Sequence, residues 1–256
     1  MTKLSLKSEF EASAEEVDSI FTNFRTLHEI YNGSIESLKQ QLASLPVAYT
    51  SKIDNAKQGF EKMSGTVLER QQAMNSQLYS QAVVLLMGNA ESILESSFKM
   101  LVIDNFRKIK LQDNRATNFS LQEVLAAKSD TDFGKLLFNK LESNKNPSEK
   151  LSFQNMQQLE KILKDNFNIR ISSDYVVGLH EFWQLRHVII HKQGYIDSKF
   201  ISNLKAAGID TKRYKTYRQV KLKQADYERC FSLLSLMFEE IDKEIDRLGL
   251  DYSVPF

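Results

Sequence analysis

The sequence has little of what interrupts regular secondary structure. Its 256 residues include only nine glycines and three prolines, too few for the many tight turns of a β-sandwich, barrel or propeller. Hydrophobic residues make up 42% of the chain and charged residues 26%, a balance that is typical of a folded globular protein and not of a disordered one. We therefore expect an all-α protein built from long helices.

Other absences narrow the class of protein. The single cysteine, Cys230, cannot form an internal disulfide, which is typical of a reducing compartment. The longest apolar run, residues 82–87, is far shorter than the roughly 20 residues that span a bilayer, and no secretion signal opens the chain. The formal net charge is only +1, so global charge does not indicate a nucleic-acid partner. We expect a cytoplasmic protein without a membrane partner.

Residues 1–78 carry two amphipathic helical patterns. Hydrophobic residues recur at spacings of three and four over residues 10–45 and again over residues 53–74, and Pro46 separates the two series. Such spacing places one apolar stripe on each helix, and a proline ends a helix because its ring clashes with the preceding turn. The pattern predicts an antiparallel, coiled-coil-like hairpin or, alternatively, two helices that simply pack on the rest of the protein.

The pattern changes to that of an up-and-down helical bundle over residues 79–256. A helix that begins near Ser80 is apolar on most sides, as is a helix over residues 172–191, and both should lie at the centre of the bundle. Gly194 is expected to end the second of these helices. The remaining helices are expected at residues 121–127, 133–141, 153–167 and 225–248.

Charged side chains interrupt the apolar helix over residues 172–191. Arg186, His187 and His191 lie in it, and a buried arginine is destabilising unless it has a partner or stays hydrated. Either Arg186 faces a cleft, or it pairs with Glu91 or Glu95, which lie one turn apart on the first central helix. A buried Arg–Glu pair that only fixes the helix register explains the same pattern.

The end of this helix resembles a known signature. The segment LRHVIIHKQG, residues 185–194, is similar to the motif of HEPN domains, which are small helical bundles and in many cases ribonucleases. That motif consists of an arginine, a polar residue, three further residues and a histidine. Arg186, His187 and His191 match its three positions. The following residues, 194–200, are similar to the corresponding segment of members linked to bacterial defence.

The resemblance extends over roughly residues 79–250. Residues 84–94 are similar to the first central helix of HEPN domains, which often carries a glutamate facing the motif. We assign this position to Glu91, with Glu95 as the alternative. HEPN toxins that pair with a nucleotidyltransferase antitoxin usually have a tyrosine two residues after the histidine, where this chain has Gln193. That departure argues against this subgroup.

The resemblance implies a metal-independent endoribonuclease that needs no cofactor. His191 would accept the proton of an RNA 2′-hydroxyl, because an imidazole exchanges protons near neutral pH. Arg186 would hold the phosphate oxygens through two parallel hydrogen bonds while negative charge develops. The product would be a 2′,3′-cyclic phosphate. His187, one turn before His191, and Glu91 would support these two catalytic side chains.

The spacing of the motif bears on how the site is assembled. Five residues of a regular α-helix place Arg186 and His191 about 140° apart, so we expect an unwound last turn or a second motif from a partner chain. HEPN ribonucleases generally dimerise around one cleft, and the resemblance implies a homodimer. His180, His187 and His191 share one stripe, but no further cysteine or histidine has a zinc-site spacing. We expect no metal.

The segment that follows the motif is strongly basic. Residues 192–223 contain nine lysines and arginines against two aspartates, with tyrosines between them. Cations neutralise phosphates, and tyrosine rings stack on unpaired bases. Lys192 and Tyr195 are therefore predicted to contact RNA, and a solvated surface loop is the alternative interpretation.

These features predict an endoribonuclease that serves as a toxin or an anti-phage defence effector, with its N-terminal helices available to an antitoxin or a sensor partner. Two alternatives remain. One is a non-catalytic HEPN-like module that binds RNA or protein and uses Arg186 and Glu91 only as a buried pair. The other is a coiled-coil scaffold whose partner binds the hairpin.

Overall fold

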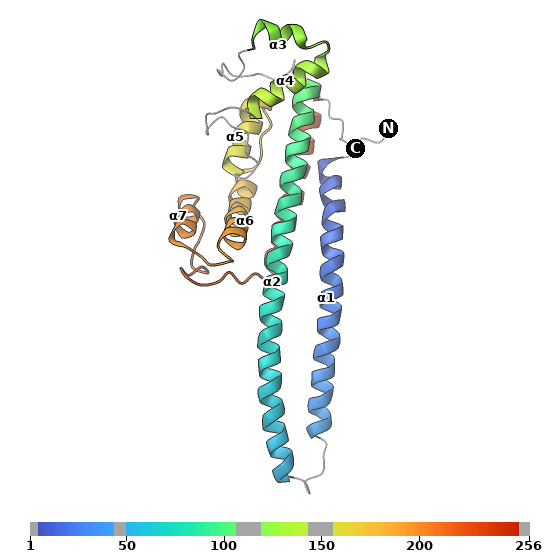
Figure 1. Ribbon diagram of the computed structural model, residues 1–256, viewed down its shortest axis with the longest axis vertical. Coiled ribbons are helices and arrows are strands. Elements are labelled where there is room, and N and C mark those ends of the chain that lie inside the picture. Colours follow the sequence, from blue (N-terminus) through green and yellow to red (C-terminus); the bar gives the residue numbers. More distant parts are fainter. Residues whose placement is uncertain (1–4, 44–49, 106–118, 143–155, 251–256) are drawn as a thin grey trace.

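The computed structural model describes residues 5–43, 50–105, 119–142 and 156–250, and the expected all-α fold is confirmed in these ranges (Figure 1). Their helices are α1 (Leu6–Ala43), α2 (Thr50–Asn105), α3 (Leu121–Ala126), α4 (Asp130–Glu142), α5 (Met156–Phe167), α6 (Ser173–His191), α7 (Ser198–Ala206) and α8 (Gln224–Arg247). No strand occurs in the described part of the chain, apart from an isolated bridge between Tyr195 and Gln219. None of the described helices is long and apolar enough to cross a bilayer.

Helix α2 extends along the whole molecule (Figure 1). Its 56 residues correspond to about 84 Å at 1.5 Å per residue. The helix continues across positions 78 and 79, where we expected the hairpin to give way to the bundle. Residues 66–87 contain neither glycine nor proline, so nothing in this stretch ends the helix. The second arm of the hairpin and the first central helix are therefore one element.

The first half of α1 is part of the core. Its buried side chains, Leu6, Phe10, Ala14, Val17 and Phe21, follow one helical stripe, and the Phe10 ring lies 5.1 Å from that of Phe238 on α8. Further along, Ile20 and Ile30 are exposed, and the end of α1 projects with the start of α2 beyond the other helices (Figure 1). Residues 1–78 thus include a packed part and a projecting antiparallel pair. The expected helix end at Pro46 lies outside the described residues.

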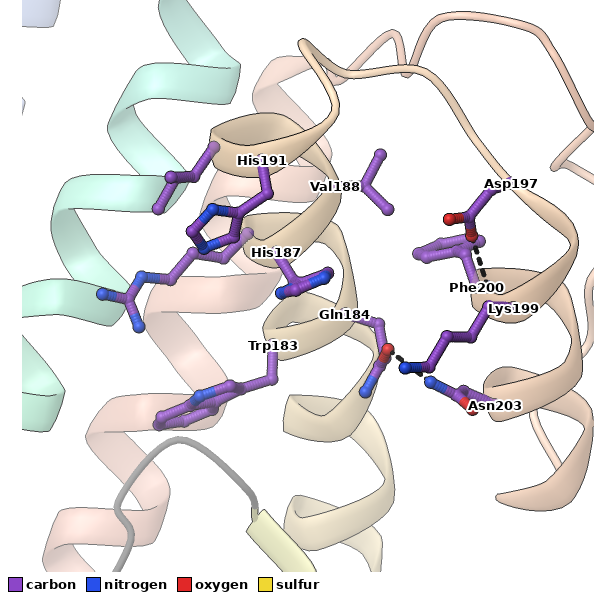
Figure 2. Close-up of a pocket in the computed structure, with 11 residues that line it drawn as sticks. Trp183, Gln184, His187, Val188, His191, Asp197, Lys199, Phe200 and Asn203 are labelled. Atoms are coloured by element: carbon purple, nitrogen blue, oxygen red, sulfur yellow. Dashed lines mark hydrogen bonds between the residues drawn. The ribbon is translucent and has the colours of Figure 1, made fainter.

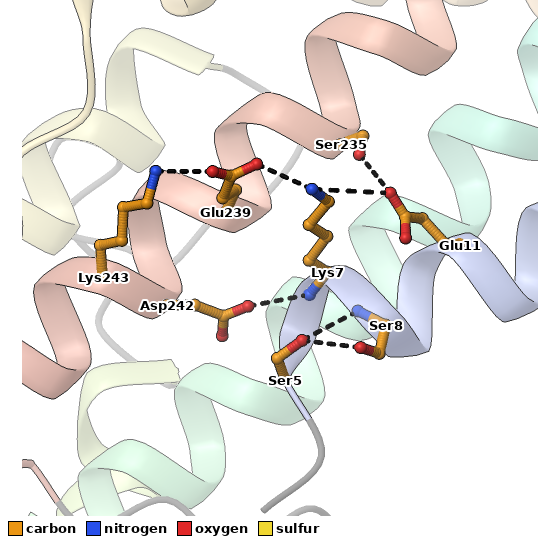
Figure 3. A network of polar contacts seen from close by, with 8 residues as sticks. All are labelled: Ser5, Lys7, Ser8, Glu11, Ser235, Glu239, Asp242 and Lys243. Atoms are coloured by element: carbon orange, nitrogen blue, oxygen red, sulfur yellow. Dashed lines mark hydrogen bonds and ion pairs between the residues drawn. The ribbon is translucent and has the colours of Figure 1, made fainter.

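Side chains of α8 hold the start of α1 (Figure 3). The Asp242 carboxylate accepts the backbone N–H groups of Leu6 at 2.9 Å and Lys7 at 3.0 Å, which otherwise lack partners at a helix N-terminus. The Lys7 ammonium donates to Glu239 at 2.7 Å. Hydrogen bonds from Lys243 and Lys7 lower the pKa of Glu239 to about 2. The start of α1 is thereby fixed to α8.

The remaining helices agree with the sequence pattern, with one addition. Helices α3, α4, α5 and α8 occupy the expected ranges to within a few residues; residues 153–155 of the third expected range lie outside the described residues. Helix α6 packs against α2, α5, α7 and α8, as its apolar character predicts. Helix α7 was not predicted. Asp197 starts it by accepting the backbone N–H of Phe200 at 2.8 Å, an ordinary N-cap.

Candidate active site

A cleft of about 280 Å³ lies between α6 and α7 (Figure 2). Its lining residues on α6 include Trp183, Arg186, His187, Ile190 and His191, which follow the i, i+3, i+4, i+7, i+8 spacing of one helix face. The opposite wall is formed by residues 197–203. Asn203 on α7 donates to the side chain of Gln184 on α6 at 3.0 Å, which ties the two walls together.

Arg186 and His191 line this cleft together within one chain. We expected an unwound last turn or a second chain to bring them together, but α6 stays helical through His191 and its last turn is not unwound. The two side chains lie at opposite edges of one stripe about 140° wide, with Ile190 and His187 between them. Neither an unwound turn nor a second chain is needed to bring both residues to the same cavity.

The turn after α6 leads the chain to the opposite wall of the cleft. The helix ends at His191, as Gly194 predicts. The backbone N–H groups of Lys192 and Gly194 both donate to the Val188 carbonyl, at 2.9 and 3.0 Å. Gly194 has a φ of +80°, a conformation that a residue with a Cβ adopts only under strain. This reversal places the residues of α7 across from the histidines.

Glu91 on α2 holds the guanidinium of Arg186. Arg186 Nη1 donates to Glu91 Oε2 at 2.6 Å, and the two side chains are 22% and 17% exposed. Glu95, the other carboxylate considered, is exposed. Arg186 Nε is buried and has no hydrogen-bond partner. The pair positions the guanidinium while leaving one of its donors unused.

The two histidines of the motif lie close together. The ring centroids of His187 and His191 are 4.8 Å apart, and both side chains are exposed on the cleft side. Partial burial lowers the pKa of His187, and the neighbouring His191 and Lys199 lower it further. His187 is therefore neutral at pH 7, because a lowered pKa falls further below that pH.

The two residues predicted to contact RNA lie outside the cleft. Lys192 is exposed at the end of α6 and is not among the cleft-lining residues. Tyr195 is 51% exposed and lines a neighbouring groove. Neither residue completes the cleft itself, and their contact with RNA stays a prediction.

The remaining histidine of α6 and the cysteine lie in the protein interior, away from the cleft. His180 is buried and does not line the cleft. Within the described ranges no three histidines, cysteines or carboxylates are grouped so that they could hold a metal. Cys230 is buried 3.7 Å from the sulfur of Met87, and burial raises the pKa of its thiol. A small core residue is what the sequence predicted at this position.

Sequence reasoning missed a second ionic cluster on α6. Glu181 is buried and accepts hydrogen bonds at 2.8 Å from Arg213, from the Tyr214 hydroxyl and from Arg229. Arg213 also donates to Asp226 at 2.6 Å, so this cation of the basic segment is committed to ion pairs. The signal that drew attention to Arg186, a charge inside the most apolar helix, applies equally to Glu181.

Comparisons with known protein families, with curated proteins and with solved structures found no match for this chain. Function has therefore to be inferred from the side chains of the cleft and their surroundings.

Proposed function

We propose that this protein is a metal-independent endoribonuclease of the HEPN type. The observation that carries the proposal is one cleft lined by Arg186, His187 and His191, in which an exchangeable proton acceptor and a fixed positive charge face the same space. When an RNA strand is cleaved by attack of its own 2′-hydroxyl on the adjacent phosphate, these are the two groups that the reaction requires.

The reaction follows from the roles of these side chains. His191 takes the proton from the 2′-hydroxyl, and the 2′-oxygen attacks the adjacent phosphorus. Arg186 stabilises the extra negative charge on the phosphate oxygens. The bond to the 5′-oxygen then breaks, the leaving oxygen takes up a proton from water, and His191 returns its proton to the solvent, so that a 2′,3′-cyclic phosphate and a 5′-hydroxyl result. His187 supports His191 from one turn away, and Glu91 orients Arg186 through their 2.6 Å ion pair.

The protein acts as a homodimer in this proposal, in the cytoplasm, as a toxin or anti-phage effector. The homodimer is proposed from the resemblance of residues 185–194 to the HEPN motif, since HEPN ribonucleases generally dimerise around one cleft. The projecting part of α1 and α2 (Figure 1) is the surface that an antitoxin or sensor would use.

One observation favours a second candidate function. The Arg186–Glu91 pair is mostly buried and joins two central helices, which is what a register-fixing pair does in a non-catalytic module that binds RNA or protein.

Cleavage of total RNA in the presence of EDTA tests the proposal. Wild-type protein should yield fragments with cyclic phosphate ends, identified by mass spectrometry. Arg186→Ala and His191→Ala should each lower the rate by about 100-fold or more while helicity and oligomeric state stay unchanged. Lys161→Ala, at an exposed position of α5, is the matched control. Cleavage that persists in either cleft variant, or that requires a metal, contradicts the mechanism.

A further inference from the structure

A second concavity, here called the basic groove, adjoins the cleft. The ring centroid of Tyr214, in its lining, lies 5.0 Å from that of Phe200, which lines the cleft. The groove has a volume of about 710 Å³, and its lining includes Tyr195, Lys215, Tyr217, Arg218, Lys221 and Lys223. All six side chains are exposed. The groove begins four residues after His191, so it is continuous in sequence with the motif.

The groove is a defined structure that backbone hydrogen bonds hold to the end of α6. Tyr217 N–H donates to the Ile196 carbonyl at 2.8 Å, Ile196 N–H donates to the Arg218 carbonyl at 3.1 Å, and Val220 N–H donates to the Gly194 carbonyl at 2.8 Å. Ile196 and Val220 are buried beneath it. These contacts fix the position of the groove relative to the cleft.

Tyr217 is held in a conformation that packing does not explain. Its φ is +62°, in the left-handed region that is unfavourable for a residue with a Cβ. Its side chain is 84% exposed, so the ring gains almost nothing from contact with the protein. Hydrogen bonds from the backbone N–H of Tyr217 to Ile196 and from that of Arg218 to Lys215 hold this conformation, and the turn thereby presents a bare aromatic ring to solvent, where a ligand can reach it.

The charge of the groove that is not paired within the protein is positive. Lys215, Arg218, Lys221 and Lys223 form no ion pair with a described residue, whereas Arg213 and Asp226 of the same lining bond to each other at 2.6 Å. The unpaired positive charge therefore remains available to a polyanion.

We infer that the basic groove binds unpaired RNA next to the linkage held in the cleft, with a base stacked on Tyr217. This inference rests on the proposed function and names the substrate class: single-stranded RNA. Bases within a duplex stack on one another and do not offer a free face to an aromatic ring, whereas unpaired bases do. The four cations follow the backbone of the same strand.

Binding can be measured without cleavage. A fluorescent oligonucleotide made entirely of 2′-O-methyl nucleotides lacks the attacking hydroxyl, and fluorescence anisotropy with the full chain reports its affinity. Wild-type protein should bind the single strand more tightly than the duplex of the same sequence. Tyr217→Ala should weaken binding of the single strand by about tenfold, and Tyr217→Phe, which keeps the ring, should not.

Two further variants separate recognition from folding. Tyr217→Gly removes both the ring and the backbone strain, so it should lose RNA affinity while its unfolding temperature stays the same or rises. Lys215→Glu with Lys221→Glu should weaken binding and flatten its salt dependence. Lys128→Glu with Lys161→Glu, the same charge change at exposed positions outside the groove, should leave both unchanged.

The results distinguish this inference from the proposed function. If the protein binds RNA through Tyr217 but does not cleave natural RNA, the proposed ribonuclease activity is contradicted and the RNA-binding groove is supported. If the wild type cleaves RNA, and Tyr217→Ala binds and cleaves RNA as well as the wild type does, then the inference that the groove binds RNA is contradicted, while the proposed activity stands. Equal affinity for duplex and single strand, or equal loss from both pairs of charge reversals, overturns it as well.

Discussion

Glu181 and Arg186 are both charged side chains of the apolar helix α6, but their surroundings differ. The two oxygens of Glu181 accept three hydrogen bonds, from Arg213, Tyr214 and Arg229. Arg186 makes one bond, to Glu91, and its Nε has no partner. The Glu181 side chain is only 4% exposed and is enclosed by its partners, whereas that of Arg186 is 22% exposed and lines the cleft. The contrast separates a structural cluster from a candidate catalytic group.

The hydrogen bonds to Glu181 also explain how the basic segment, residues 192–223, is attached to α6. Arg213 and Tyr214 belong to the segment that follows the motif, and through Glu181 they attach it to α6. Burial raises the pKa of the Tyr214 hydroxyl, and the negative charge of Glu181 raises it further. The hydroxyl therefore remains protonated and continues to donate its hydrogen bond.

Removing the charge of Glu181 should have the largest effect on stability. Glu181→Gln removes the negative charge that pairs with two arginines and replaces one of the two accepting oxygens by an NH₂ group facing their donors, and we expect the free energy of unfolding to fall by about 2–3 kcal/mol. Urea unfolding followed by circular dichroism measures this. Glu16→Gln, at an exposed position of α1, should change nothing. A stable Glu181→Gln protein would show that the cluster is not structural.

The corresponding change at Arg186 should act on catalysis more than on stability. Glu91→Gln keeps an oxygen near Arg186 but removes the charge that orients it, and we expect RNA cleavage to fall by about tenfold. The partly exposed pair should contribute only about 1 kcal/mol to the free energy of unfolding.

The adjacent carboxylate supplies the control for this variant. Glu95 is exposed one turn further along α2, so Glu95→Gln should alter neither cleavage nor stability. If Glu91→Gln costs as much stability as Glu181→Gln and leaves cleavage intact, the pair only fixes helix register, and the comparison between the two sites fails.

The smallest effect should be a pH dependence of stability. Burial lowers the pKa of both His180 and His187 on α6, so below about pH 6.5 the unfolded chain binds more protons than the folded one. Stability is therefore lost as pH falls from 7 to 5. Thermal unfolding at several pH values should show this decline, and His187→Gln should reduce it. A midpoint that does not change in wild type over this range contradicts the prediction.

Local patterns in the sequence were sufficient to predict the positions of most helices. The extent of α6, its end before Gly194 and the apolar character that buries it follow from the spacing of hydrophobic residues and from one glycine, because helices depend on contacts within a few residues. The same spacing placed Arg186, His187 and His191 on one helix. Their resemblance to a ribonuclease motif is a property of the sequence as well, and the activity stays a prediction.

The tertiary structure decided which side chains meet. Asp242 caps a helix that begins more than 200 residues earlier, Glu181 gathers its partners from α8 and the segment before it, and α7 supplies the opposite wall of the cleft. It also brought both edges of the motif to one cavity. Sequence spacing carries no information about such partners, since contacts between distant segments depend on how the helices pack.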